Sequence, residues 1–82
     1  MGLDIVELVL AVEERFHLDI PDEEAQRLET PRQLVDYVAQ WRQATSREYA
    51  QIEAIVFELV RETTGLATFD PDAHFVRDLN LE

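Results

Sequence analysis

The chain has 82 residues, of which 46% are hydrophobic and 30% are charged, a composition typical of one globular domain and not of a disordered segment. Seven arginines oppose eighteen acidic residues, so the formal net charge is -11. Such a charge repels phosphate backbones and anionic lipid surfaces, which argues against nucleic acid and favours a basic protein surface as partner. The same charge also serves solubility, so composition does not choose between these two roles.

Two further absences narrow the class of protein. No run of about 18 apolar residues and no basic-then-apolar leader is present, so we predict neither a membrane span nor a secretory signal. The chain contains no cysteine, which excludes disulfides and thiolate metal sites and gives no sign of an oxidising compartment. We therefore expect a single cytoplasmic domain over residues 1–82.

The first predicted helix covers residues 3–16 and combines an apolar face, which we expect to pack in the core, with an acidic face. Its apolar residues recur at helical spacing and are Leu3, Val6, Val9, Leu10, Val12 and Phe16. The acidic residues on the remaining surface are Asp4, Glu7, Glu13 and Glu14. Asp4 and Glu7 also suit a helix start, because they lie near the positive end of the helix dipole.

Proline and threonine mark the next boundaries. Pro21 ends the first helix near Phe16 or His17, because it removes an amide hydrogen and restricts the residue before it. A short helix is predicted over residues 22–28, with Asp22 as its cap. Thr30 and Pro31 then signal a helix that reaches about Gln43. Its apolar periodicity comes from Leu34, Val35, Tyr37, Val38 and Trp41.

The region from residue 44 to residue 65 permits two arrangements. Apolar residues from Tyr49 to Val60 predict a helix that ends at Gly65. Neither glycine nor proline occurs between Pro31 and Gly65, so one continuous helix over residues 32–64 would allow a domain-swapped dimer. We favour a monomer with a hairpin connection at 44–47, because Thr45 and Ser46 are weak helix formers that serve readily as caps.

The remaining residues are predicted to be loop or are left unassigned. Because the predicted elements are all helices, the expected fold class is all-α. Residues 66–74 form a loop with a turn at 70–72, and residues 75–82 alternate too briefly to be assigned. No stretch alternates long enough to predict a strand. We expect a bundle of three main helices and one short helix.

Catalytic and metal-binding patterns are weak, and we predict that the chain is not an enzyme. Ser46 is the only serine and is interpreted as a helix cap, since no base lies near it in the sequence. His17 suits a helix C-terminus, and His74 falls in or after a loop without a metal partner at ligand spacing. The acidic clusters lack the spacing of a calcium-binding loop, so we expect no metal.

Beyond these patterns, the chain resembles the type II acyl carrier proteins, with its halves in exchanged order. Residues 3–16 and 20–25 resemble the second helix and following loop of that family. The rest of the first half, through Thr30 and on to residues 35–38, resembles its short third helix and its last helix. Residues 52–65 resemble the first helix, and residues 72–79 resemble the segment before the modified serine. Residues 1–43 therefore look like the family's C-terminal half and residues 47–82 like its N-terminal half, joined near 44–47, as in a circular permutation.

The resemblance also implies where a prosthetic group would attach. In the family, a serine within an Asp-Ser-Leu motif carries 4'-phosphopantetheine. Glu82 matches the motif's Asp, Leu3 its Leu and Asp4 the acidic residue that follows, which implies that Glu82 and Leu3 meet in space. Gly2 stands where the serine belongs and has no hydroxyl. We therefore expect no cofactor on this chain as written.

The resemblance further implies a role in fatty-acid or polyketide-type metabolism, through docking onto basic acyl-transfer or synthase enzymes. The implied docking residues are Leu3, Asp4, Val6, Glu7, Leu10, Glu13 and Glu14. Three interpretations remain at this point. The chain is a permuted carrier homologue that acts as a binding or regulatory module, an excerpt or engineered permutant of a working carrier, or a plain helical interaction domain.

Overall fold

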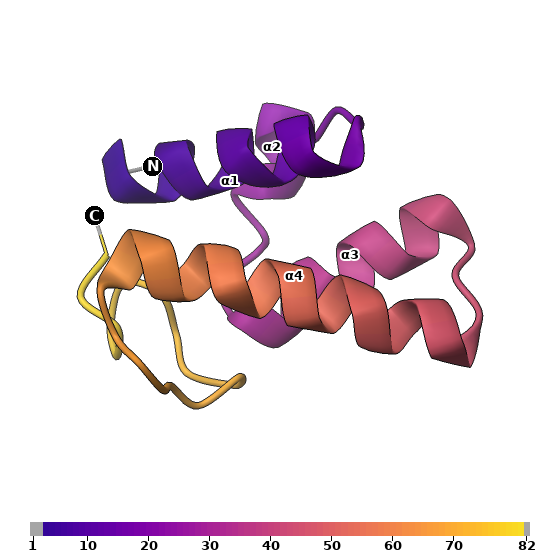
Figure 1. Ribbon diagram of the computed structural model, residues 1–82. Coiled ribbons are helices and arrows are strands. Elements are labelled where there is room, and N and C mark those ends of the chain that lie inside the picture. Colours follow the sequence, from indigo (N-terminus) through magenta and orange to yellow (C-terminus); the bar gives the residue numbers. More distant parts are fainter. Residues whose placement is uncertain (1–2, 82) are drawn as a thin grey trace.

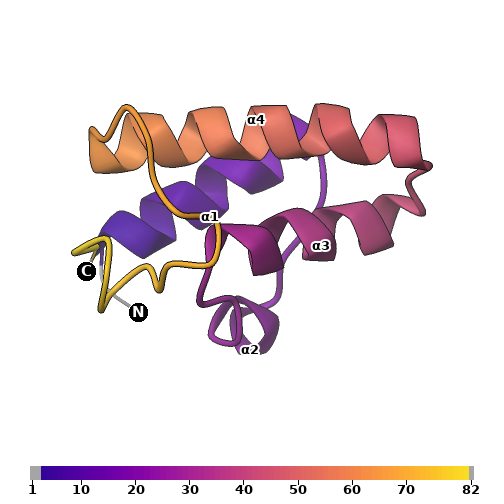
Figure 2. The same cartoon turned by 90° about the horizontal axis from the view of Figure 1, so that it is seen from below.

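The computed structural model describes residues 3–81, and every regular element within them is a helix. The helices are α1 (Leu3–Phe16), α2 (Asp22–Ala25), α3 (Pro31–Arg42) and α4 (Ser46–Thr64). Figures 1 and 2 show α1 and α3 lying against the long α4, with the short α2 at one side. The predicted all-α class, with three main helices and a short one, is confirmed for the described part of the chain.

One hydrophobic core holds these helices together. Val12 of α1, Val35 of α3 and Val56 of α4 are completely buried, so each main helix contributes to the centre. Phe75 and Leu81, which follow the last helix, belong to the same cluster and are 2% and 3% exposed. The segment that the sequence left unassigned is therefore part of the core.

The buried face of α1 is rotated from the predicted one. It consists of Ile5, Leu8, Val9, Val12 and Phe16. The prediction that Val6 and Leu10 face the core was wrong: Val6 is half-buried and Leu10 is 50% exposed. Since consecutive apolar residues occur twice in this helix, the sequence allowed more than one apolar stripe.

Left-handed residues end both α1 and α3. His17 has φ 55° and Gln43 has φ 52°, a conformation that glycine adopts most easily. The amide of Leu18 donates to the carbonyl of Glu13 at 3.1 Å, and the amide of Ala44 donates to the carbonyl of Ala39 at 2.9 Å. Because Gln43 turns the chain, the hairpin connection is confirmed and the continuous helix over residues 32–64 is wrong. A domain-swapped dimer that needs that helix has no support in this structure.

The helix starts follow the threonines. Thr30 caps α3 by accepting the Gln33 amide at 3.1 Å, with Pro31 as the first helical residue, as predicted. Thr45, and not Ser46, caps α4, and Glu48 returns the bond to the Thr45 amide. This bond lowers the pKa of Glu48, because it favours the charged carboxylate.

The predicted cap at Asp22 was also wrong. Asp22 is the first residue of α2, and Pro21 occupies the cap position without a side-chain bond. Its carboxylate still lies in the first turn, where the helix dipole favours a negative charge.

A polar network fastens α3 to α4. Arg32 donates to a carboxylate oxygen of Glu53 at 2.5 Å and to the Tyr49 hydroxyl at 3.0 Å. The Tyr49 hydroxyl in turn donates to Asp36 at 2.6 Å. The bond to Glu53 raises the pKa of Arg32 further above its usual range. The network links residues on both sides of the hairpin and so supports its antiparallel pairing (Figure 2).

None of the helices between residues 3 and 81 combines the length and apolar character needed to cross a bilayer.

Trp41, part of the apolar pattern that predicted α3, is 53% exposed, whereas Leu34, Val35 and Val38 are buried.

Two glycine exchanges test the left-handed helix ends. We expect Gly65→Ala to lower the free energy of unfolding by about 1 kcal/mol, since Gly65 has φ 76°. A Cβ at Gly65 would meet no atom within 4 Å, so the loss would come from the backbone alone. Gln43→Gly should raise the free energy by about 0.5 to 1 kcal/mol. Urea unfolding of both variants measures these changes. If both substitutions shifted the free energy of unfolding in the same direction, the left-handed backbone would not be the property that decides stability at these two positions.

Candidate functional site

Both ends of the described chain lie at the same end of the molecule. In Figures 1 and 2 the start of α1 and the end of the C-terminal segment lie side by side, beside the end of α4. The amide of Leu81 donates to the carbonyl of Phe75 at 2.9 Å, which folds this segment back on itself. The predicted attachment position, Gly2, and its predicted neighbour Glu82 lie outside the described residues.

Most of the predicted docking residues share the outer surface of α1. Glu7 and Glu14 are exposed, Leu10 is 50% exposed, and Val6 is half-buried. Their spacing of three and four residues places them in one stripe on the side of α1 away from the core. We call Val6, Glu7, Leu10 and Glu14 the α1 face. It combines apolar contact area with negative charge, a combination suited to a basic protein surface.

The other predicted docking residues are not members of the α1 face. Asp4 is half-buried in the first turn of α1, and the side chain of Leu3 is not among those described. Glu13 is half-buried, and its carboxylate accepts the amide of Ile20 at 2.8 Å. This bond fastens the loop after α1 to the helix, so Glu13 has a structural role that the sequence did not indicate.

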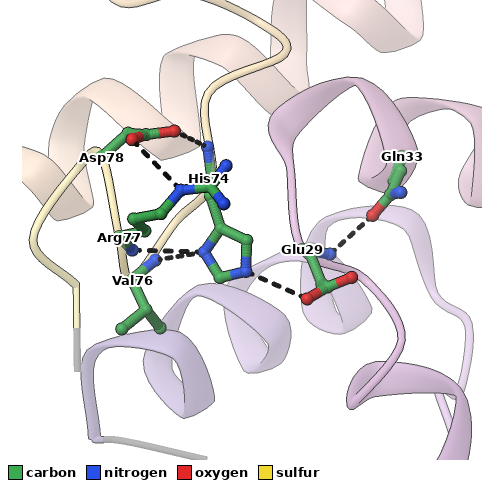
Figure 3. Close-up of polar contacts among 6 residues, drawn as sticks. All are labelled: Glu29, Gln33, His74, Val76, Arg77 and Asp78. Carbon is green, nitrogen blue, oxygen red and sulfur yellow. Dashed lines mark hydrogen bonds and ion pairs between the residues drawn. The ribbon is translucent and has the colours of Figure 1, made fainter.

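A second polar cluster surrounds His74 in the C-terminal segment (Figure 3). The amides of Val76 and Arg77 donate to the Nδ1 atom of His74 at 3.1 and 3.2 Å. The Nε2 atom lies 3.0 Å from a carboxylate oxygen of Glu29, in the loop before α3. Because Nδ1 accepts two hydrogen bonds, the proton of the neutral ring belongs on Nε2, from which it donates to Glu29.

Main-chain bonds complete this cluster. The amide of His74 donates to Asp78 at 2.8 Å, and this bond lowers the pKa of the Asp78 carboxyl. The amide of Phe75 donates to the carbonyl of Glu29 at 2.8 Å. His74 and Asp78 thus cap a single turn in the way that a capping box starts a helix. The pair of His74 and Glu29 was not predicted, because these residues are 45 positions apart and share no local pattern.

The residues considered for catalysis and metal binding lie apart along the described part of the chain. No group of three histidine or acidic side chains within residues 3–81 is placed to hold a metal ion. Ser46 begins α4, at the opposite end of that helix from the C-terminal segment that holds His74 (Figure 1). In the described part of the chain no buried side-chain nitrogen or oxygen lacks a hydrogen-bond partner.

Comparison with known proteins bears on the first half of the chain. Residues 3–38 match a family model described as "Phosphopantetheine attachment site". An acyl carrier protein from Helicobacter hepaticus is 53% identical over 37 residues, which are 45% of this chain and 49% of that protein. The chain thus spans about half the length of this curated relative. No solved structure matches the chain significantly. The family match begins directly after Gly2 and includes the α1 face.

A comparison of Glu13 with its neighbour Glu14 distinguishes the structural role of Glu13 from the effect of its charge alone. We expect Glu13→Ala to lower the free energy of unfolding by about 1 to 2 kcal/mol, because it leaves the amide of Ile20 without its partner. Glu14→Ala removes the same charge from an exposed site and should change stability by less than about 0.5 kcal/mol. Thermal unfolding of the two variants checks this, and similar losses would show that the Ile20 bond contributes little.

Proposed function

We propose that the chain is a cytoplasmic recognition module of fatty-acid or polyketide-type metabolism. The proposal starts from residues 3–38, which match a phosphopantetheine attachment-site family and resemble part of an acyl carrier protein. Proteins of this family are carriers and not catalysts, which agrees with the expectation that the chain is not an enzyme. Its partners would be acyl-transfer or synthase enzymes with basic surfaces. The chain as written would dock on them without a prosthetic arm of its own.

The observation that carries this proposal is the α1 face. It lies inside the matched residues, and it leaves Glu7, Leu10 and Glu14 exposed on a helix whose other side is fixed in the core. Because the helix backbone is already ordered, binding through this face costs only the ordering of the side chains themselves, which supports a role in recognition. The net charge of -11 adds long-range attraction to a basic partner.

We further propose that residues 47–82 supply the part that precedes the attachment motif in the family. Two observations support this exchanged order. The start of α1 and the end of the C-terminal segment lie side by side in both views (Figures 1 and 2). The antiparallel hairpin of α3 and α4 needs only residues 43–45 as a connection. A join of this kind is tolerated where the original chain ends lie close together.

The residues that match the family's attachment motif do not fit 4'-phosphopantetheine. The arm attaches through a hydroxyl, and Gly2 at the matching position has none. Residues 3–8 of α1 and residues 75–81 of the C-terminal segment contain no serine, threonine or tyrosine either. We therefore assign no prosthetic group to the chain as written.

Intact-mass measurement tests whether the chain can accept a phosphopantetheine arm. After incubation with a phosphopantetheinyl transferase and coenzyme A, we expect no mass gain on this chain. The acyl carrier protein from Helicobacter hepaticus, treated in parallel, should gain one arm. A gain of one arm on this chain would show that another residue accepts it and would contradict the proposed loss of attachment.

Charge reversal tests the α1 face. We expect Glu7→Lys with Glu14→Lys to slow association with that transferase by about tenfold at low salt, because the field that steers a basic partner would be reversed locally. The difference should shrink as salt is added. Stopped-flow association rates at two salt concentrations measure both effects.

The matched control is Glu58→Lys with Glu62→Lys on α4, which makes the same change in net charge at two other exposed positions. We expect this pair to slow association much less. Equal slowing by both pairs would show that total charge, and not the α1 face, governs the encounter.

A further inference from the structure

We propose that His74 is a pH-sensitive positioning residue, whose neutral ring holds the C-terminal turn in place at the edge beside α1. The turn covers residues 74–79, and the amides of Asp78 and Leu79 close it by donating to the carbonyl of His74 at 2.9 and 3.1 Å. The consequence for partner binding rests on the proposed function, whereas the role of His74 in the turn does not.

The imidazole occupies the position that a serine, threonine, aspartate or asparagine usually takes at a helix start. It accepts the amides of the second and third residues after it, Val76 and Arg77, through one nitrogen. Its other nitrogen faces Glu29, which joins the turn to the loop before α3. Figure 3 shows the ring between these two groups.

Protonation of the ring breaks the bonds that Nδ1 accepts and preserves the contact between Nε2 and Glu29. A charged imidazole carries hydrogens on both nitrogens, so Nδ1 no longer accepts the amides of Val76 and Arg77. The Nε2 hydrogen still faces the Glu29 carboxylate, and the contact becomes an ion pair. Protonation therefore exchanges two capping bonds for one charged pair, and the turn loses its cap while the ring stays in place.

The charged groups around the ring do not restore the lost bonds. Glu29 lies on the Nε2 side, and Asp78 is already engaged with the amide of His74. Arg77 forms an ion pair with Asp78 at 3.5 Å, with its side chain 75% exposed. None of these groups is an acceptor placed at the freed amides of Val76 and Arg77.

The turn matters because its two ends are anchored in the core. Phe75 and Leu81 are buried, and between them the chain passes through Asn80, which has φ 59°. Without the cap, the segment is still held by these anchors, by the pair with Glu29 and by the remaining main-chain bonds, so the loss is confined to the part of the turn around Val76 and Arg77. If the α1 face binds partners as proposed, a partner would meet a looser edge beside α1 at low pH than at high pH.

Amide hydrogen exchange of the full chain tests this proposal without any partner. We would measure protection factors for Val76 and Arg77 at about pH 5 and about pH 8, which span the range where histidine changes charge. Protection factors remove the intrinsic pH dependence of exchange. In the unmodified chain we expect protection at both amides to fall by about tenfold at the lower pH, equivalent to about 1.4 kcal/mol.

Two variants identify the residue responsible. His74→Asn keeps an acceptor for the same amides but does not titrate, so protection should stay similar at both pH values. His17→Asn replaces the other histidine, which is exposed, and should keep the pH dependence of the unmodified chain.

Protection that is independent of pH in the unmodified chain would overturn the proposal, as would a pH dependence that persists in His74→Asn. A proposal that fails here leaves the charge-reversal result intact. Conversely, a charge-reversal result that spoke against docking through the α1 face would leave the hydrogen-exchange result unchanged.

Discussion

The burial of Phe75 and Leu81 is the constraint on which the rest of the structure depends. These side chains come from a segment without regular helix, yet they join the same core as the buried residues of α1 and α4. Their burial keeps the end of the described chain beside the start of α1 (Figures 1 and 2). Without it, only polar bonds such as those to Glu29 would hold this segment to the rest of the fold, and the edge on which the proposed function relies would lose its apolar anchors.

The core also explains how α1 can serve recognition. One side of the helix is fixed by residues such as Leu8 and Val12, which are 1% and 0% exposed. Glu13, at the boundary of that side, fastens the following loop through the amide of Ile20. Glu7, Leu10 and Glu14 on the opposite side are thereby presented by a rigid element. The recognition role that we propose for the α1 face depends on this rigidity.

The sequence predicted the helices well, because apolar periodicity and strong local signals agree with the packing. Thr30 and Pro31 started α3, and Gly65 ended α4, as expected. Local signals failed where two neighbours were chemically alike. Thr45 and Ser46 are both capping residues, and the apolar run in α1 fits two faces. The pair of His74 and Glu29 depends on the tertiary fold, so no local pattern could have shown it.

A reordered chain would test the central claim, that residues 47–82 and 3–43 form one carrier-type domain in exchanged order. In this variant residues 47–82 come first, a single serine follows Glu82, and residues 3–43 complete the chain. We expect the reordered chain to fold cooperatively and, after treatment with transferase and coenzyme A, to gain the mass of one phosphopantetheine arm. A reordered chain that fails to fold, or that folds and gains no arm, would contradict the account.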